Sequence, residues 1–390
     1  MVTARVTAPS HPGDVSSWRD VVTTLGIVDS ASSRLFDPKA QVAVVPLSRN
    51  EWLTAGVWRI ADHTRSVVLK RMAPPDRRDS GHSWDAHWTA QATQPHHWNY
   101  WRREALLYES DLLGVFVESG IGTPDVVAIE RSDSGIDLWL EDIRRTPASQ
   151  WPLSQYADAA YCLGRTQAFF ARDGLPKCDW LSRGFLRAYS GEKPFPDILL
   201  EDGNAWTSPL IASHFSMPLR HGLVRFSQNK EAIYAIAERL PRTLCHLDFW
   251  TRNLFGAHCS GTVVIDWSFT GDGAIGEDIG NLIPSAALDG FVAAESLPAL
   301  EATVLPAYLA GLKAGGWTDD PRLVRLGMCA SAVKYVWLGA AMLESARRPH
   351  HPVYAGYGGM DAEDRFRQTA NVLEFLVRWA DEACHLVDEI

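Results

Sequence analysis

The chain has 390 residues, of which 46% are hydrophobic and 22% are charged, and its formal net charge is -10 at pH 7. This length suffices for two domains or two large lobes with substantial cores, and the composition is ordinary for a soluble globular protein. The acidic balance argues against a broad surface for nucleic acids or anionic membranes, although it allows a local basic pocket. We therefore expect neither nucleic acid nor a membrane as a partner.

The six cysteines are widely scattered and form no C-x-x-C pair. In a chain of this size they indicate reduced core residues and not a disulfide framework or a zinc site. The first residues, MVTARVTAPSHPGD, lack the apolar core of a signal peptide, and no apolar run reaches the roughly 18 residues of a membrane span. The sequence therefore predicts a cytoplasmic protein, and its patterns favour no particular oligomeric state.

The first part of the chain has the pattern of a small lobe that is rich in strands. A short helix is predicted around residues 16–25. From Gln41 onward, the runs QVAVVPL, GVWRIA and SVVLKRM are rich in β-branched residues and separated by polar turns, which predicts a three-stranded antiparallel meander. Residues 73–98 show little periodicity and several turn formers, which is typical of an insertion.

One helix and two further strands complete this lobe. The helix is predicted over residues 99–113, with Glu104 on its apolar face. The segments PDVVAIER (124–131) and IDLWLEDI (136–143) then predict two strands joined by a turn. The expected N-terminal lobe, residues 1–142, is thus a five-stranded antiparallel sheet with one helix.

Residues 143–390 are expected to form a large, mainly α-helical lobe. Pro152 can open a helix at its first position, and the apolar spacing continues to Gly174. The sequence therefore predicts an α+β protein of two lobes. Further helical patterns lie near residues 229–240, 292–314, 321–346 and 361–388.

The polar groups with the clearest chemical pattern lie between residues 243 and 266. His246 to Asn253 has the form H-x-D-x-x-x-x-N, and Asp266 follows the apolar run TVVI. An aspartate in such a loop can accept or orient the proton of a substrate hydroxyl while phosphate is transferred. Asp248 is therefore the candidate general base, whereas His246 is expected to fix the loop. The alternative for Asp248 alone is a surface turn in which it caps the following segment.

Asn253 and Asp266 are the candidate metal ligands. Their side chains offer hard oxygen atoms of the kind that Mg2+ prefers, and Mg2+ in proteins also retains waters and bridges substrate phosphates. The alternative is that NLFGA and TVVID are the strands of a hairpin whose polar ends only cap turns. The two interpretations are compatible, because a hairpin would bring both side chains to one end.

A lysine and a glutamate of the N-terminal lobe form a second candidate group. Lys70 directly follows Val67–Leu69, so a strand would present it beside apolar neighbours, where an unpaired charge is costly. Glu104 on the next helix is the natural partner for such a lysine. The alternative is two solvated charges on opposite surfaces.

The order of these features resembles the aminoglycoside phosphotransferase and choline kinase-like branch of the protein-kinase-like fold. The resemblance spans about residues 41–282, and the H-x-D-x-x-x-x-N loop together with VVIDWSFTGDGAIGEDIGNL is its most specific part. It implies ATP bound between two lobes, with Asp248 as the catalytic base. It also implies that Asn253 and Asp266 are ligands of Mg2+.

The same resemblance implies nucleotide contacts in the N-terminal lobe. Lys70 would contact the α- and β-phosphates, and Glu104 would position this lysine. Backbone groups around Glu141 and Ile143 would match the hinge that holds adenine.

The hairpin that covers the phosphates departs from the family pattern. It should lie at residues 48–60, SRNEWLTAGVWRI, where Gly56 is the only glycine. In glycine-rich loops the backbone N–H groups can approach phosphates because no side chains intervene. With Trp52 and Leu53 present, we expect this cover to work differently.

Three other features have mainly structural interpretations. Asp278 in EDIGNL resembles a family position that braces the catalytic loop, and the alternative is a cap at the start of a helix. The four histidines between residues 82 and 97 are irregularly spaced, which favours a flap over a zinc site. Residues 347–360, RRPHHPVYAGYGGM, are predicted to form a loop near a possible substrate entrance.

Together these features predict an ATP- and Mg2+-dependent kinase that phosphorylates a hydroxyl of a small molecule. Aminoglycosides or other antibiotics, amino sugars and alcohol metabolites are all candidate acceptors. One alternative is a nucleotide-binding regulator without chemistry, which the glycine-poor cover would suit. The other alternative is a kinase whose acceptor is a peptide serine or threonine.

Overall fold

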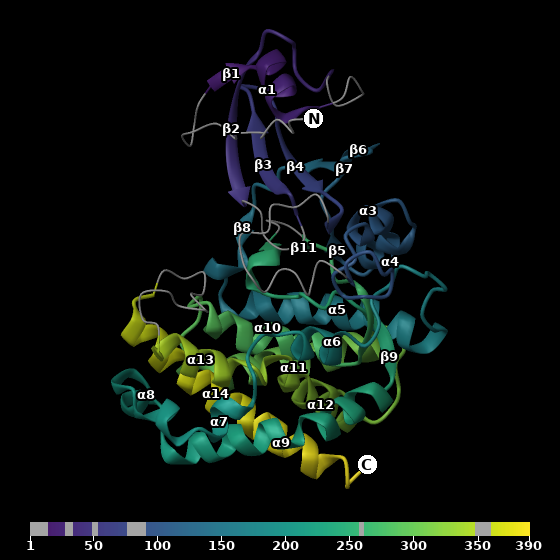
Figure 1. Cartoon of the computed structure of the whole chain (residues 1–390). Coiled ribbons are helices and arrows are strands. Elements are labelled where there is room, and N and C mark those ends of the chain that lie inside the picture. Colours follow the sequence, from purple (N-terminus) through teal and green to yellow (C-terminus); the bar gives the residue numbers. More distant parts are fainter. Residues whose placement is uncertain (1–14, 28–33, 49–53, 76–90, 257–260, 348–359) are drawn as a thin grey trace. The chain divides into compact units, whose positions relative to one another are not determined.

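The computed structural model divides the chain into two compact units (Figure 1). Unit 1 comprises residues up to 95, 99–113 and 123–144, and unit 2 comprises 96–98, 114–122 and 145–390. The sequence placed a single boundary after residue 142, whereas two short stretches before it cluster with unit 2. The structure describes residues 15–27, 34–48, 54–75, 91–256, 261–347 and 360–390.

Unit 1 is built on a six-stranded antiparallel sheet in the order β1-β2-β3-β4-β7-β6. The five predicted strands are present, but the predicted sheet was one strand too small. The additional strand, β1, has only 3 residues, which are too few to show an alternating pattern in the sequence. The strands are β1 (Val15–Ser17), β2 (Gln41–Ser48), β3 (Gly56–Ala61), β4 (Ser66–Met72), β6 (Val126–Ser132) and β7 (Gly135–Glu141).

The helix predicted over residues 99–113 is instead two short helices. They are α3 (Arg103–Tyr108) and α4 (Leu112–Glu118). Ser110 lies between them, and its hydroxyl donates to the main-chain carbonyl three residues earlier at 2.7 Å. The same oxygen accepts the main-chain N–H two residues later at 3.4 Å. Local bonds of this kind compete with helical hydrogen bonds, which explains the interruption.

Separate apolar clusters cover the two faces of the sheet. On one face, Leu69 and Trp139 pack with α1 (Trp18–Leu25). On the other, Leu138 packs with Ala105 of α3. Because successive side chains of a strand point to opposite faces, Lys70 lies on the α3 face, directly opposite Leu138 in the ladder.

Short strand pairs frame the loop at residues 246–253 in unit 2. The loop follows β9 (Arg242–Cys245), which pairs antiparallel with β12 (Gly271–Ala274). It ends at β10 (Leu254–Gly256), which pairs antiparallel with β11 (Thr262–Val264). The second pair is the predicted hairpin. Two short edge strands, β5 (Ile121–Gly122) and β8 (Thr146–Pro147), extend it in the order β5-β11-β10-β8.

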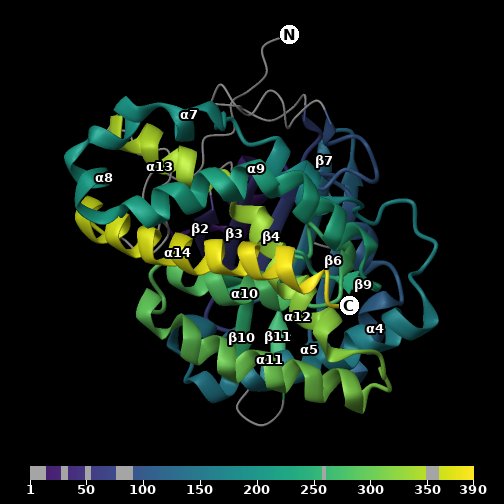
Figure 2. The same ribbon diagram turned by 90° about the horizontal axis from the view of Figure 1, so that it is seen from below.

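The rest of unit 2 is mainly helical, as predicted. The predicted helix near 229–240 is the end of the longer α9, and the pattern near 321–346 is divided into α12, the short 3-10 helix η7 and α13. Figure 2 shows α14 alongside α9 and α11 alongside α5. The main helical elements are α5 (Leu153–Asp173), α6 (Phe185–Gly191), α9 (Met217–Arg239), α10 (Glu277–Leu288), α11 (Leu297–Ala314), α12 (Pro321–Ala330), η7 (Ser331–Tyr335), α13 (Leu338–Arg347) and α14 (Ala362–Leu386).

Glycines allow α5 and α11 to pack with their backbones in close approach. A side chain at Gly164 of α5 would overlap the main-chain oxygen of Tyr308, and one at Gly311 of α11 would overlap that of Tyr161. These reciprocal contacts fix α5 against α11, and α5 carries Gln167 toward the loop at residues 246–253.

The stretch Pro321–Arg347 is long and apolar enough to pass a composition test for a membrane span, with a mean hydropathy of 1.4. However, 94% of the most apolar 18-residue window of this stretch is buried inside the protein, which is typical of a core segment.

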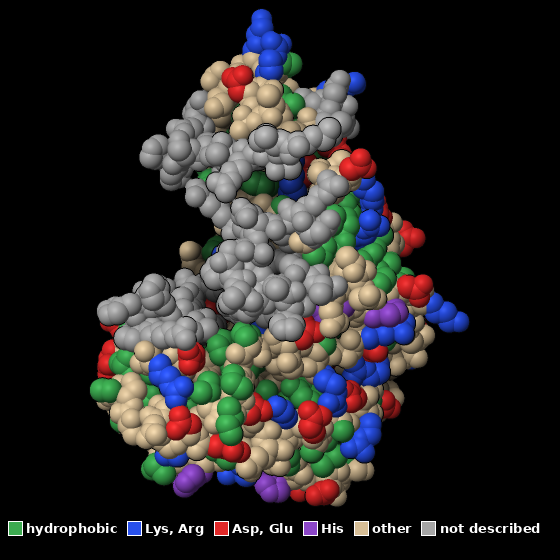
Figure 3. Space-filling model, viewed as in Figure 1, with side chains coloured by type: hydrophobic (Ala, Val, Ile, Leu, Met, Phe, Trp, Pro, Cys, Tyr) green, Lys and Arg blue, Asp and Glu red, His purple; other side chains and the backbone are tan. Residues whose placement is uncertain are grey.

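Among the described residues on the face drawn in Figure 3, acidic and basic side chains of unit 2 are interspersed.

Candidate active site

The loop after β9 has a constrained backbone that Asp278 holds in place. Leu247 has a φ of 64°, a left-handed conformation that is uncommon for residues other than glycine. The carboxylate of Asp278 accepts the N–H of His246 and the N–H of Leu247, both at 2.8 Å. Asp278 therefore braces the loop, as the family resemblance implied, and it does not act as the cap of α10.

Asp278 belongs to a buried hydrogen-bond network. The side-chain amide nitrogen of Gln167 donates to the carboxylate of Asp278 at 2.8 Å. The hydroxyl of Tyr308 donates to the side-chain oxygen Oε1 of Gln167. Burial raises the pKa of Asp278 to about 6, although the two main-chain N–H donors favour its charged form. The loop is therefore attached to α5 and α11 as well as to α10.

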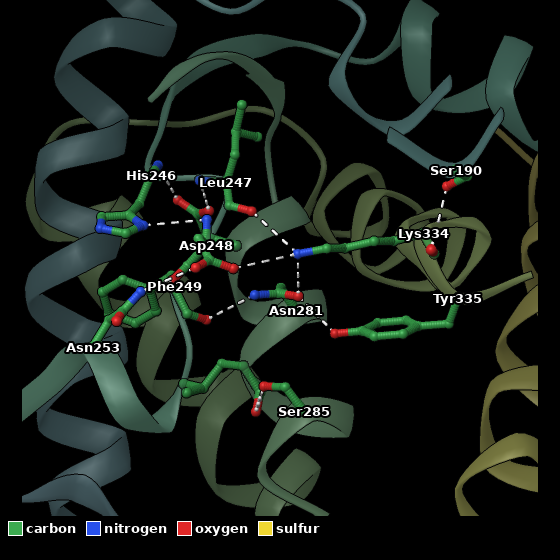
Figure 4. A network of polar contacts seen from close by, with 12 residues as sticks. Ser190, His246, Leu247, Asp248, Phe249, Asn253, Asn281, Ser285, Lys334 and Tyr335 are labelled. Carbon is green, nitrogen blue, oxygen red and sulfur yellow. Dashed lines mark hydrogen bonds and ion pairs between the residues drawn. The ribbon is translucent and has the colours of Figure 1, made fainter. Parts of the chain in front are cut away.

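His246 fixes the loop through both ring nitrogens. Its Nδ1 accepts the main-chain N–H of Asp248 at 3.2 Å, and its Nε2 lies 3.1 Å from the main-chain oxygen of Ile265. An N–H can only donate and a carbonyl can only accept, so this geometry requires the tautomer protonated at Nε2. In Figure 4 a dashed line joins the ring to the main-chain nitrogen of Asp248, whereas the lines from the carboxylate of Asp248 lead to Asn253 and Lys334. His246 thus has the scaffold position that the sequence suggested.

Asp248 and Asn253 are in direct contact. The amide nitrogen Nδ2 of Asn253 donates to Oδ2 of Asp248 at 3.1 Å and to its main-chain oxygen at 3.0 Å (Figure 4). Asn253 is buried in the short 3-10 helix η5 (Thr251–Asn253), whereas the side chain of Asp248 is 26% exposed. The candidate base therefore has a fixed orientation and remains accessible to a substrate.

The hairpin places Asp266 near Asn253. The main-chain N–H of Ile265 donates to the main-chain oxygen of Asn253 at 3.0 Å, so Asp266 follows directly after the last bond between the two strands. Asp266 has a φ of 60°, and its Oδ1 accepts the hydroxyl of Ser268 at 2.7 Å. The predicted hairpin thus brings the two candidate metal ligands to one end.

The two side chains fit the requirements of a Mg2+ site. Because Asn253 donates to Asp248 through Nδ2, the atom that it can offer to a metal is the carbonyl oxygen Oδ1. Together with the carboxylate of Asp266, this makes a set of hard oxygen donors, which Mg2+ completes with waters and phosphates. No group of three or more His, Cys, Asp or Glu side chains suited to a metal occurs among the described residues.

Lys70 and Glu104 form a buried ion pair in unit 1. Nζ of Lys70 lies 2.5 Å from Oε2 of Glu104, and the two side chains are 8% and 1% exposed. The strand and the helix therefore present the two charges to each other, and the alternative of solvated charges on opposite surfaces is wrong.

Three other predicted nucleotide contacts can be located in unit 1. Glu141 is the last residue of β7, and its N–H donates to the main-chain oxygen of Asp125 at 2.9 Å. Ile143 follows two residues after the strand ends. Gly56 begins β3 with a φ of 148°, and a side chain there would overlap the ring of Trp58. Gly56 therefore makes room for the indole ring of Trp58. A contact between Gly56 and a phosphate group remains a prediction.

Several sequence features lie outside the described residues. They include Trp52 and Leu53 of the predicted phosphate cover and most of the loop at residues 347–360. Among the four histidines of the predicted flap, His96 and His97 are described. Both belong to unit 2, and Nε2 of His97 lies 2.6 Å from Oε1 of Glu192.

The sequence interpretation missed Lys334, which lies beside the candidate base. Nζ of Lys334 is 3.7 Å from Oδ1 of Asp248, and it also donates to Oδ1 of Asn281 at 2.7 Å. Two signals could have indicated these residues. Lys334 is a lone charge in the apolar stretch ASAVKYVWLG, and Asn281 follows Asp278 by three positions, on the same face of α10.

The chain is similar to a known protein family and to solved structures. A family described as "Phosphotransferase enzyme family" matches residues 46–318. An aminoglycoside phosphotransferase from Alicyclobacillus acidocaldarius is 16% identical, with a TM-score of 0.52 over 98% of this chain and 99% of the other. The amicoumacin kinase hAmiN, solved with AMP-PNP, Ca2+ and Ami, is 12% identical, with a TM-score of 0.50 over 89% of each chain. The search of curated proteins found no match.

The structural likenesses show the fold, which is the bilobal α+β fold of aminoglycoside phosphotransferases and protein kinases. The family match covers more than half of the 390 residues and includes Lys70, the loop at 246–253 and Asp266. The chain belongs to the phosphotransferase enzyme family.

Proposed function

We propose that the protein is an ATP- and Mg2+-dependent kinase that transfers the γ-phosphate of ATP to a hydroxyl group of a small molecule. The observation that carries this proposal is the position of the Asn253 amide. Its nitrogen holds Oδ2 of Asp248 at 3.1 Å, which directs its oxygen away from the base. The Asn253 side chain can therefore contact the candidate base through its nitrogen and a metal ion through its oxygen.

Asp248 is the proton acceptor in this mechanism. The acceptor hydroxyl donates a hydrogen bond to the Asp248 carboxylate and attacks the γ-phosphorus atom. A new O–P bond forms, the bond from the γ-phosphorus to the bridging oxygen of ADP breaks, and the hydroxyl proton passes to Asp248. His246 and Asp278 hold the loop, so the carboxylate does not need to reorganise during transfer.

Asn253 and Asp266 would hold Mg2+, which neutralises phosphate charge when it is bound. In unit 1, the ion pair with Glu104 fixes the ammonium group of Lys70, which we assign to the α- and β-phosphates. Gly56, Glu141 and Ile143 remain candidates for contacts with the nucleotide.

The acceptor is proposed to be an aminoglycoside or another antibiotic, an amino sugar or an alcohol metabolite. The names of two proteins that share the fold, an aminoglycoside phosphotransferase and an amicoumacin kinase, support this choice of panel. The test is to incubate the enzyme with MgATP and each acceptor and to identify products by phosphorus NMR. A phosphate ester formed from one acceptor supports the proposal.

Two variants sharpen this experiment. Asp248→Ala should abolish ester formation, whereas Asp158→Ala, which removes an exposed aspartate of α5, should leave it unchanged. If ATP binds but its γ-phosphate passes neither to an acceptor nor to water, the result would instead favour a nucleotide-binding regulator. Ester formation by Asp248→Ala at the wild-type rate would exclude Asp248 as the base.

A further inference from the structure

We propose that Lys334 is a positioning residue that fixes the carboxylate of Asp248 in the orientation needed to accept the hydroxyl proton. This inference rests on the proposed kinase function and assigns to that site a residue from η7, 86 positions after the base in the chain. The basis is the geometry of the ammonium group of Lys334 against the loop.

Lys334 is deeply buried, and three oxygen atoms surround its ammonium group. The residue is 5% exposed. Nζ donates to the main-chain oxygen of Leu247 at 3.2 Å and to Oδ1 of Asn281 at 2.7 Å, and it lies 3.7 Å from Oδ1 of Asp248. An ammonium group has three protons, so each can be directed to one of these oxygens (Figure 4).

The carboxylate of Asp248 is consequently held from two sides. Asn253 donates to Oδ2, and the charge of Lys334 lies beside Oδ1. Each carboxylate oxygen has two lone pairs, so an oxygen that is held by a donor can still accept a hydrogen bond from the substrate. Lys334 therefore restricts rotation of the carboxylate without blocking its function as a base.

Lys334 is also connected to the main chain on both sides of Asp248. It binds the carbonyl of Leu247 directly, and its partner Asn281 donates to the carbonyl of Phe249 at 3.3 Å. The hydroxyl of Tyr335 donates to Oδ1 of Asn281 at 2.6 Å, which fixes the orientation of that amide. A shift of η7 would therefore move the base, since the contacts form one connected network.

A lysine side chain is costly to bury, and the burial of Lys334 therefore argues for a role beyond filling space. Burial lowers the pKa of Lys334, while the nearby carboxylate of Asp248 favours its charged form. The rings of Phe185 and Tyr189 lie 5.2 Å from Nζ, at distances where aromatic faces attract a cation. An apolar side chain could fill the same volume but could not orient a carboxylate.

The test compares Lys334→Met, Lys334→Arg and Lys334→Ala with the wild-type enzyme in MgATP turnover, using the acceptor found above or water. Lys334→Met and Lys334→Ala should lower kcat about 10- to 100-fold, the loss expected when a reacting group is misplaced, with KM for MgATP unchanged. Lys334→Arg should retain more activity than Lys334→Met. Lys313→Met, which changes an exposed lysine of α11, should behave as wild type.

Chemical rescue separates the effect of charge from the effect of shape. Propylammonium chloride added to Lys334→Ala should restore part of kcat, whereas 1-propanol, which has a similar shape without the charge, should not. Melting temperatures of all variants, measured in parallel, identify any that fail to fold, and Lys334→Arg then provides the comparison.

The outcomes are distinct. Wild-type kcat in Lys334→Met, or equal rescue by propanol and propylammonium, would overturn the role of Lys334 while leaving the kinase function intact. A wild-type protein that transfers phosphate to neither an acceptor nor water would overturn the kinase function and this inference with it.

Discussion

Asn253 donates its side-chain amide to both the carboxylate and the main-chain oxygen of Asp248, at 3.1 and 3.0 Å. The five-residue spacing between them contains the short helix η5, which turns the chain back so that the amide meets the aspartate. The same turn leads directly into β10 and the hairpin that ends near Asp266. The candidate base and the candidate metal ligands are thus parts of one local structure.

The ion pair between Lys70 and Glu104 provides the first prediction. Lys70→Met leaves the Glu104 carboxylate buried without this partner, so it should destabilise unit 1 by about 3 kcal/mol. The double variant Lys70→Met/Glu104→Met removes both charges and should be less destabilised than Lys70→Met alone. Urea denaturation of the wild type, Lys70→Met, Glu104→Met and the double variant measures the coupling free energy between the two side chains. Additive effects of the two changes would show that the pair contributes nothing.

The brace formed by Asp278 provides the second prediction. Asp278→Asn keeps the size of the side chain but can offer only one oxygen to the two main-chain N–H groups of His246 and Leu247. Losing a charged hydrogen bond of this kind should cost about 2 kcal/mol of stability. It should also lower kcat, because Leu247 would lose the contact that holds its left-handed conformation. Thermal denaturation and turnover check these effects, and Asp158→Asn provides the control.

The pH dependence of stability provides the third prediction, through Glu277. Burial raises the pKa of Glu277 from the ordinary 4.5 to about 7. Between these values the folded state binds more protons than the unfolded state, so the free energy of unfolding falls as pH rises. The resulting loss in the free energy of unfolding is complete above about pH 7, where it amounts to at most about 3 kcal/mol. Glu277→Gln should remove this part of the pH dependence.

The measurement for Glu277→Gln is urea denaturation at pH 5 and pH 8. The gain in the free energy of unfolding of Glu277→Gln over the wild type should be larger at pH 8 than at pH 5. Asp278 is present in both proteins, and its raised pKa acts in the same direction in each. An identical difference in stability at both pH values would exclude the assigned effect of Glu277.

The close contact between α5 and α11 provides the fourth prediction. Gly311→Ala would place a methyl group against the main-chain oxygen of Tyr161 and should destabilise unit 2 by about 1–3 kcal/mol. Gly114→Ala in α4 is the matched control, because a side chain there meets no atom within 4 Å. It should be neutral or stabilise the protein by up to about 1 kcal/mol. Equal effects of the two changes on the melting temperature would contradict this packing.

The sequence predicted the features that a local pattern of residues marks. The spacing from His246 to Asn253 and the apolar run before Asp266 were sufficient to locate the loop and its hairpin. Lys70 could be paired with Glu104 because a lysine that directly follows an apolar strand run requires a counter-charge. In each case a local pattern carried the physical requirement.

The features that the sequence did not reveal depend on contacts between distant segments or on very short elements. Lys334 contacts Asp248 from η7, which interrupts the stretch from α12 to α13, and the apolar helical pattern of the sequence hides that interruption. β1 is recognised only through its pairing with β2, since its 3 residues show no period of their own. The break between α3 and α4 depends on the hydroxyl of Ser110.

The central claim is that Asp248 accepts the proton of the attacking hydroxyl. The most direct test is the single-turnover rate of phosphate transfer by Asp248→Asn at saturating MgATP, with the affinity for MgATP measured by calorimetry. Asparagine keeps the shape of the side chain but cannot serve as the base, so the rate should fall by at least about 100-fold while the affinity changes little. A variant that transfers phosphate at the wild-type rate would contradict the claim.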